Sequence, residues 1–143
     1  MTRRKAMTGK TMTGNSYDPQ CPTRQVLDRI GDKWTVLVLI LLLDEPVRFN
    51  ELRRRVAGVS QKMLSQTLKS MERDGLVHRR AIATVPVTVE YSITPLGQTL
   101  AALVDQMRLW AEQNLAHVMA AQRRYDRAQP MPAPKEIKTI RAA

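Results

Sequence analysis

Polar side chains recur on one face of the segment between residues 60 and 73. A helix turns by about 100° per residue, so five side chains share that face: Lys62, Ser65, Gln66, Lys69 and Arg73. A glutamine amide can bond an adenine edge through two atoms, a lysine can reach the acceptors of guanine, and a serine suits either. Lysine and arginine also suit phosphates. The face therefore has the chemistry to bind a nucleic-acid duplex, with base reading expected from Ser60, Gln61, Lys62, Ser65 and Gln66, and phosphate contact from Lys69 and Arg73.

The neighbouring sequence predicts the element that would hold this face in place. The opposite side of the same segment is apolar and would face a core: Met63, Leu64, Thr67, Leu68 and Met71. Ser60 suits the N-cap of this helix, and Gly75 suits its end. Before it, Asn50 is expected to cap a helix that runs to about Val56, and Ala57-Gly58-Val59 is expected to form a tight turn. Two helices joined by a short glycine-containing turn are the helix-turn-helix motif.

Two strands are predicted directly after the second helix. Residues 76–83 and 87–93 are rich in β-branched side chains, and Pro86 lies between them as a turn residue. A hairpin in this position is a wing, and Arg79 and Arg80 lie at its base. On and before the first helix of the motif, four further side chains are expected to lie beside phosphates: Arg48, Asn50, Arg53 and Arg54.

Two helices are predicted before the motif. The apolar pattern starts at Cys21 and breaks at Gly31-Asp32. The second helix, Lys33 to Leu43, is apolar nearly all round. We therefore expect it to form the buried centre of the domain.

A long helix is predicted after the hairpin. Thr94 suits its cap and Pro95 its first turn, and it runs over about residues 95–124. Its apolar seam steps by four and three residues, weakens at Asn114 and His117, and consists of Leu96, Leu100, Leu103, Met107 and Trp110. So small a domain cannot bury this seam alone, so we expect it to form the interface of a two-fold homodimer. The expected fold class is mainly α with a small β-hairpin (α+β), a winged helix-turn-helix with N- and C-terminal dimerisation helices.

The composition agrees with one basic domain between two tails. The chain has 143 residues and a formal charge of +10. Residues 48–80 hold nine basic and three acidic residues, which places a net +6 on the predicted motif and the hairpin base. We expect a disordered basic arm over 1–18, a domain over 19–125, and a disordered proline-containing tail over 126–143. Such a charge favours a polyanion as partner, nucleic acid ahead of a membrane surface.

Other sequence features bear on compartment and metal binding. The longest apolar run, Val36 to Leu43, is far short of the roughly 20 residues that span a bilayer, and Arg3-Arg4-Lys5 is not followed by the apolar stretch of a secretory signal. The single Cys21 excludes an intramolecular disulfide and a cysteine-rich zinc site, and His78 and His117 stand apart from any ligand cluster. We expect a cytoplasmic, nucleoid-associated protein without metal or cofactor.

Six short motifs carry a resemblance to a known family. They are Cys21-Pro22, Gly31-Asp32-Lys33-Trp34, Arg48-Phe49-Asn50-Glu51-Leu52, Gly58-Val59-Ser60-Gln61-Lys62-Met63-Leu64-Ser65, Asp74-Gly75-Leu76-Val77 and Val89-Glu90-Tyr91-Ser92-Ile93-Thr94-Pro95-Leu96-Gly97. Over about residues 21–118 the chain resembles the HxlR-type winged helix-turn-helix regulators of bacteria. The resemblance implies a homodimeric transcription factor whose N-terminal and long C-terminal helices form the dimer interface. Similar proteins often carry a basic residue where this chain has Thr88, and Arg79 and Arg80 are candidates to replace it.

Cys21 and two tryptophans are candidates for sensing. Some members of this family sense oxidants or electrophiles through a cysteine at the position of Cys21. A helix start and Arg24 favour a thiolate there, whereas nearby aspartates oppose it. The alternative is a cysteine kept for capping or packing. Trp34 and Trp110 could line a pocket for a small aromatic effector, or they could be packing residues of the core and the dimer.

Three classes of function compete for this sequence. An enzyme is disfavoured, because no glycine-rich phosphate loop, nucleophile elbow, or carboxylate and histidine cluster is present. A non-specific nucleic-acid-binding architectural protein is an alternative, since the polar face could be the ordinary solvent face of a helix in a basic protein. The turn, the hairpin and the local charge agree better with a sequence-specific regulator of transcription. Repression is the default expectation, because a dimer on a promoter blocks polymerase without further surfaces.

Overall fold

The computed structural model describes residues 13–130, so most of the two predicted tails lies outside the described residues. The chain divides into two compact units, Met1–Gln106 and Met107–Ala143, whereas the sequence predicts one domain over 19–125. The division falls inside the last helix, because none of the described residues after Val104 is fully buried. No helix within the described range is long and apolar enough to cross a bilayer.

Two helices precede the helix-turn-helix motif and separate where Gly31-Asp32 predicts. They are α1 (Thr23–Gly31) and α2 (Lys33–Leu42). The Asp32 carboxylate caps α2, since it accepts hydrogen bonds from the backbone N–H groups of Trp34 at 2.8 Å and Thr35 at 3.2 Å. α2 contributes several fully buried side chains to the core, as predicted, and α1 contributes none.

The motif begins with β1 (Val47–Arg48) and α3 (Phe49–Arg55). The predicted cap at Asn50 is wrong, because the N-cap is Arg48 and Asn50 lies in the first turn of α3. The helix starts early because Arg48 is still extended backbone, paired with Glu90 of a later strand, and the chain turns directly after it. The inward-facing residues are as predicted, Leu52 and Val56.

The second helix of the motif is α4 (Gln61–Arg73). Ser60 caps it as predicted, since its hydroxyl oxygen accepts a hydrogen bond from the N–H of Met63 at 3.0 Å. Gly58 in the turn before α4 and Gly75 after it have φ values of +87° and +74°, the left-handed region that favours glycine. Met63 is 41% exposed, contrary to prediction, because it lies at the edge of the apolar face. The buried face consists of Leu64, Thr67, Leu68 and Met71.

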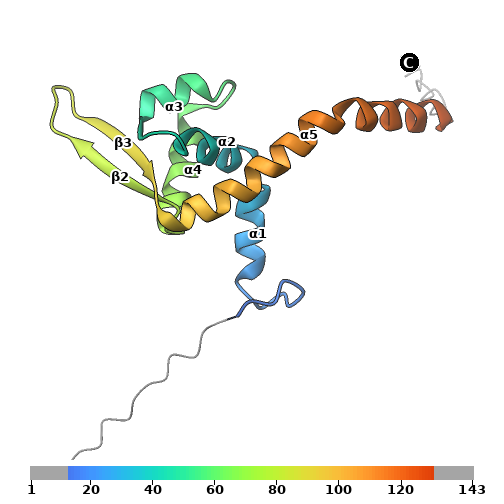
Figure 1. The fold of residues 1–143 in the computed structure, drawn as a ribbon, viewed down its shortest axis with the longest axis horizontal. Coiled ribbons are helices and arrows are strands. Elements are labelled where there is room, and N and C mark those ends of the chain that lie inside the picture. Colours follow the sequence, from blue (N-terminus) through green and yellow to red (C-terminus); the bar gives the residue numbers. More distant parts are fainter. Residues whose placement is uncertain (1–12, 131–143) are drawn as a thin grey trace, which may run out of the picture. The chain divides into compact units, whose positions relative to one another are not determined.

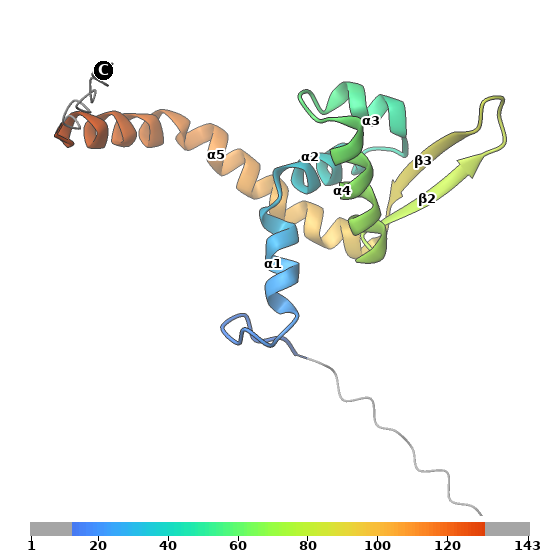
Figure 2. The same cartoon turned by 180° about the vertical axis from the view of Figure 1, so that it is seen from behind.

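The wing is the hairpin of β2 (Val77–Ile82) and β3 (Thr88–Ile93). β1 pairs with β3, so the sheet has three antiparallel strands in the order β1-β3-β2. The sequence predicts the hairpin but not the pairing of β1 with β3, because β1 has only two residues and so shows no alternation of apolar and polar side chains. Figures 1 and 2, seen from opposite sides, both show the tip of the hairpin standing clear of α3 and α4.

The last helix, α5 (Pro95–Ala128), is continuous and ends at Ala128 rather than near Arg124. Thr94 caps it as predicted. The Thr94 hydroxyl accepts a hydrogen bond from the N–H of Gly97 at 3.0 Å and donates one to the carbonyl of Gly75 at 2.6 Å. One hydroxyl therefore joins the turn after α4 to the start of α5, whose buried residues are Gly97, Ala101 and Val104.

Gly97 lies where no side chain fits. A Cβ atom added there would be 2.1 Å from the carbonyl oxygen of Leu76 and 2.8 Å from Cγ1 of Ile93. Because the nearer atom is backbone, Gly97→Ala should lower the free energy of unfolding by about 1–3 kcal/mol. Gly31→Ala is the matched control, since nothing lies within 4 Å of an added Cβ there. Urea unfolding followed by circular dichroism measures both variants, and equal stability of the two would contradict the close contact at Gly97.

Candidate nucleic-acid interface

The exposed face of α4 carries the side chains predicted to read bases. Leu64, Leu68 and Met71 are fully buried, which fixes the rotation of the helix about its own axis. The polar side must therefore face solvent. All seven predicted contacts on this helix and its cap are exposed: Ser60, Gln61, Lys62, Ser65, Gln66, Lys69 and Arg73.

Two arginines of α3 are bonded within the protein. Arg53 Nη1 donates to Gln61 Oε1 at 3.4 Å, which joins a predicted phosphate contact to a predicted base contact across the turn. Arg54 forms an ion pair with Glu51. Both arginines are exposed, so water and salt screen these interactions and a polyanion can compete for the guanidinium groups. The motif thus brings Arg53 of α3 beside the start of α4.

The two arginines at the base of the wing lie on opposite faces of the hairpin. Side chains alternate along a strand, and the cross-strand partners are Arg79 with Tyr91 and Arg80 with Glu90. Arg80 forms an ion pair with Glu90 at 3.0 Å. Arg79 instead lines a hollow with Lys69 of α4 and hydrogen-bonds Tyr91. Arg79 therefore lies beside the polar face of α4, and Arg80 does not. The alternation of side chains along a strand could have predicted that the two arginines lie on opposite faces.

Tyr91 is a site residue that the sequence analysis does not single out. It is 7% exposed, and its alternation along β3 marks it only as a strand residue. Burial raises the pKa of the Tyr91 phenol above its ordinary value, and the hydrogen bond from Arg79 partly opposes this. The phenol therefore stays neutral at pH 7 and holds Arg79 beside α4.

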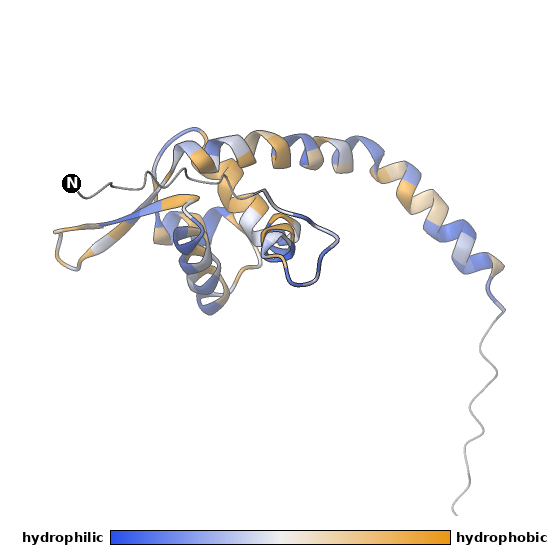
Figure 3. Ribbon diagram, turned by 90° about the horizontal axis from the view of Figure 1, so that it is seen from below, coloured by the Kyte–Doolittle hydropathy of each residue, from blue (hydrophilic) through white to orange (hydrophobic). Residues whose placement is uncertain are grey.

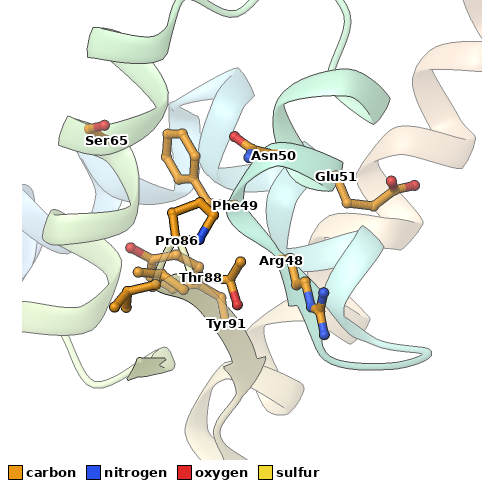
Figure 4. A pocket seen from close by; sticks show the side chains of 10 residues that line it. Arg48, Phe49, Asn50, Glu51, Ser65, Pro86, Thr88 and Tyr91 are labelled. Atoms are coloured by element: carbon orange, nitrogen blue, oxygen red, sulfur yellow. The ribbon is translucent and has the colours of Figure 1, made fainter. Parts of the chain in front are cut away.

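A hollow of about 520 Å³ lies between α3, α4 and the wing (Figure 4). Its polar lining includes Arg48, Asn50 and Ser65, which are predicted to contact phosphates or bases. Thr88, the predicted wing contact, lines it too. The fold therefore gathers predicted contacts from three separate elements around one concave surface.

A second hollow, of about 380 Å³, is apolar and lies between α1 and the start of α5. Leu96 and Leu103 line it and are 57% and 62% exposed. At its edge, Arg29 Nε and Asp74 Oδ2 form an ion pair at 2.7 Å, which ties α1 to the residue that ends α4. The remaining lining is Val26, Leu76, Thr99 and Leu100. Three of the five predicted dimer residues are thus on one apolar surface.

The other two predicted dimer residues belong to the second unit. Met107 and Trp110 are 54% and 61% exposed. The sequence predicts an apolar seam that weakens at Asn114 and His117, but the row of exposed apolar side chains continues with Leu115, Val118 and Met119. The apolar surface of α5 is therefore longer than the steps of four and three residues indicate.

Cys21 lies just before α1, inside a short bonded loop. Its sulfur is 3.2 Å from the hydroxyl oxygen of Thr23 and accepts a hydrogen bond from the N–H of Asn15 at 3.3 Å. These bonds, that of the Thr23 hydroxyl first, lower the pKa of the thiol below its ordinary value, while the charge of Asp18 opposes them. Arg24 bonds the carbonyls of two loop residues instead of the thiol. The predicted thiolate preference therefore has a different cause from the one expected.

Trp34 and Trp110 lie in different units. Trp34 is half-buried, and the ammonium of Lys33 lies 4.6 Å from its ring centre. An aromatic effector pocket between the two tryptophans stays a prediction. Within residues 13–130, no group of three or more His, Cys, Asp or Glu side chains is placed to hold a metal ion.

These elements define a winged helix-turn-helix protein: a two-helix motif with a buried inner face and a polar outer face, followed by a wing. A profile of the HxlR-like helix-turn-helix family matches residues 29–119. The chain belongs to this family, as its motifs predict, and is a transcriptional regulator with a helix-turn-helix domain.

Relatives and solved structures agree with this assignment. The HTH-type transcriptional regulator YtfH of Escherichia coli (strain K12), itself uncharacterized, is 45% identical over 107 residues, which are 75% of this chain and 85% of YtfH. A structure of the regulator ytfH from Salmonella typhimurium has a TM-score of 0.75 and 43% identity, over 78% of this chain and 99% of that one. The redox regulator HypR in its reduced form has a TM-score of 0.63 and 40% identity, over 69% and 98%. The predicted fold class is confirmed.

The bond between Thr23 and Cys21 makes a testable difference to thiol chemistry. Removing the hydroxyl in Thr23→Val should raise the pKa of the thiol toward its ordinary value, because the thiolate loses its strongest stabilising contact. The midpoint of the alkylation rate by iodoacetamide as a function of pH should then move to higher pH than in the wild type. Thr99→Val, whose hydroxyl bonds the Leu96 carbonyl instead, should leave the pH profile unchanged. Identical profiles for Thr23→Val and the wild type would contradict this role for the hydroxyl.

Proposed function

We propose that this protein is a sequence-specific double-stranded DNA-binding transcriptional regulator that acts as a homodimer on a two-fold-related operator. The observation that carries the proposal is the division of α4 into a fully buried apolar face and an exposed face of hydrogen-bonding and basic side chains. A helix of 13 residues is about 20 Å long and fits the major groove, where each base pair presents a distinct pattern of donors and acceptors.

The proposed contacts fall into two groups, those that read bases and those that hold phosphates. Gln66 would bond an adenine edge, Lys62 a guanine edge, and Ser60, Gln61 and Ser65 would read further bases. Phosphates would be held on either side by the proposed phosphate set: Arg48, Asn50, Arg53, Arg54, Lys69 and Arg73. Arg79 joins this set, since it lines a hollow with Lys69.

Self-association is supported by the apolar side chains that one chain leaves exposed. Leu103, Met107 and Trp110 follow one another by four and three residues along α5 and are each more than half exposed, and a contiguous exposed apolar patch marks an interaction site. A second copy related by a two-fold axis would cover them and present the reading helix twice. Such a dimer would act on the chromosome in the cytoplasm, and repression follows if it occupies a promoter.

Redox control is the second part of the proposal. Cys21 is partly exposed, hydrogen bonds lower the pKa of its thiol, and a similar protein, HypR, is described as a redox regulator. In the oxidised state, the Cys21 thiols of two copies would give up two protons and two electrons to an oxidant such as diamide and form one disulfide bond. The alternative is that Cys21 only caps and packs the loop before α1.

Two substitutions on α4 separate specific from non-specific binding. Gln66→Ala should cost about 1–3 kcal/mol on a duplex enriched from a random-sequence pool by the wild type, and little on scrambled DNA, because it removes a base contact. Lys69→Ala should weaken binding to both and reduce the slope of log affinity against log salt by about 1, because it removes a phosphate contact. Fluorescence anisotropy titrations measure both. Equal losses on the two duplexes for Gln66→Ala would favour the non-specific architectural alternative.

The thiol is tested on the same enriched duplex. Diamide should change the affinity of the wild type in gel-shift titrations and leave Cys21→Ser unchanged, because Cys21 is the single cysteine of the chain. Restoration by dithiothreitol would identify the change as thiol chemistry. If wild type and Cys21→Ser respond to diamide in the same way, the thiol is not the sensor.

A further inference from the structure

The tip of the wing is uncharged in a chain that is otherwise rich in charge. No charged residue occurs from Ala81 to Val89, directly after a segment with a net charge of +6. Val85 is fully exposed and Val87 is 65% exposed. Figure 3 shows the tip of the hairpin in the hydrophobic colour. Adjacent apolar side chains at the end of a projecting element indicate an interaction surface.

The polar groups of the tip are bonded among themselves. The Thr84 hydroxyl donates to the carbonyl of Pro86 at 2.8 Å and lies 3.0 Å from the hydroxyl of Thr88. The N–H of Thr84 donates to the carbonyl of Ile82 at 2.8 Å. These bonds hold the loop in one shape, so what it presents outward is mainly apolar. A preformed surface of this kind loses little conformational entropy on binding.

The tip borders the same concave surface as the polar face of α4. Pro86 and Val87 line the 520 Å³ hollow together with Ser65 of α4 and Asn50 of α3 (Figure 4). β2 has six residues and extends about 20 Å at 3.3 Å per residue. Half a helical turn of DNA, which separates a major groove from the next minor groove, is about 17 Å. The hairpin is therefore long enough to span from the major groove that would hold α4 to the adjacent minor groove.

We propose that the wing tip inserts Val85 and Val87 into this minor groove as an apolar wedge and bends the duplex there. The inference rests on the proposed function, because it requires α4 in the major groove. Apolar side chains in the minor groove partly unstack base steps and kink DNA. Pyrimidine–purine steps deform most easily, so the tip adds a sequence preference without a hydrogen bond to any base.

The charges around the tip argue for DNA as its partner rather than another protein surface. The uncharged tip gains no electrostatic attraction to phosphate of its own. Arg48 and Glu51 line the hollow that the tip borders, and Glu51 is paired with Arg54. Arg79, Lys69 and Glu72 line the neighbouring hollow. The net positive charge at the base of the wing and on α4 therefore supplies the attraction to phosphate. In this proposal, basic residues attract the DNA, and Val85 and Val87 deform it.

The test uses the full chain, the double variant Val85→Ser/Val87→Ser, and Ala83→Ser as a matched control in the same exposed loop. The probe is a duplex enriched by the wild type from a random-sequence pool, with a scrambled duplex beside it. Affinity is measured across a range of salt concentrations, and bending is measured by circular-permutation gel mobility. Thermal melting of each variant checks the fold, which these exposed positions should leave unchanged.

The double variant should bind the enriched duplex about tenfold more weakly and bend it less, because two apolar side chains no longer leave water. Its slope of log affinity against log salt should equal that of the wild type, because no phosphate contact is lost. Ala83→Ser should behave as the wild type. A second selection with the double variant should lose the pyrimidine–purine preference at the wing position.

Three results would overturn the wedge while leaving the proposed function intact: unchanged affinity and bending, a reduced salt slope, or a change in sedimentation with no change on DNA. The second would mean a phosphate contact, and the third would mean that the tip contacts another copy. If the wild type shows no preference for the enriched duplex over the scrambled one, both the proposed function and the wedge fail.

Discussion

The junction around the Thr94 hydroxyl determines how the DNA-binding elements leave the core. This hydroxyl bonds the Gly75 carbonyl just after α4 and the Gly97 N–H at the start of α5, and the Thr94 N–H bonds the Leu76 carbonyl at 3.1 Å. The end of α4, the first strand of the wing and the start of α5 therefore meet within a few ångströms. Backbone approaches backbone so closely that position 97 has no room for a side chain. This tightly packed, hydrogen-bonded junction thus sets the angle between α4 and the wing, so the two elements can present one continuous surface.

Local chemistry made much of this fold predictable. Ser60 and Thr94 were predicted as caps, because a side-chain oxygen at a helix start acts on the N–H groups that follow it. The buried face of α4 followed from helical spacing in the same way. The same reasoning predicts a cap at Asn50 and is wrong there. Pairing between β1 and β3 keeps the chain extended up to Arg48, so the helix starts before the asparagine. Contacts that follow no helical or strand repeat, such as the Asn15 N–H on Cys21 six residues along or Arg79 on Tyr91 of the facing strand, leave no periodic trace in a sequence.

Charged and uncharged residues occupy different parts of the candidate interface. Much of the excess positive charge lies on α3, α4 and the base of the wing, and part of it is balanced locally by Glu51 and Glu90. These exposed ion pairs lower the local potential only slightly, since water screens them. The end of the hairpin, from Ala81 to Val89, carries no charge. In the proposed complex, this surface would attract a polyanion by charge and would discriminate between sequences at its centre and its edge by fit.

The exposed apolar side chains of α5 link the stability of the protein to its concentration if the chain dimerises. All fully buried residues of α5 lie in its first third, and the described residues beyond it include a row of exposed apolar side chains. Isolated helices are marginal in water, so this stretch gains its stability when those side chains are covered. If a second copy covers them, folding and association are a single equilibrium, and stability rises with protomer concentration by mass action. Dilution then unfolds and dissociates the protein together, so the copy number in the cell sets how much of it can occupy DNA.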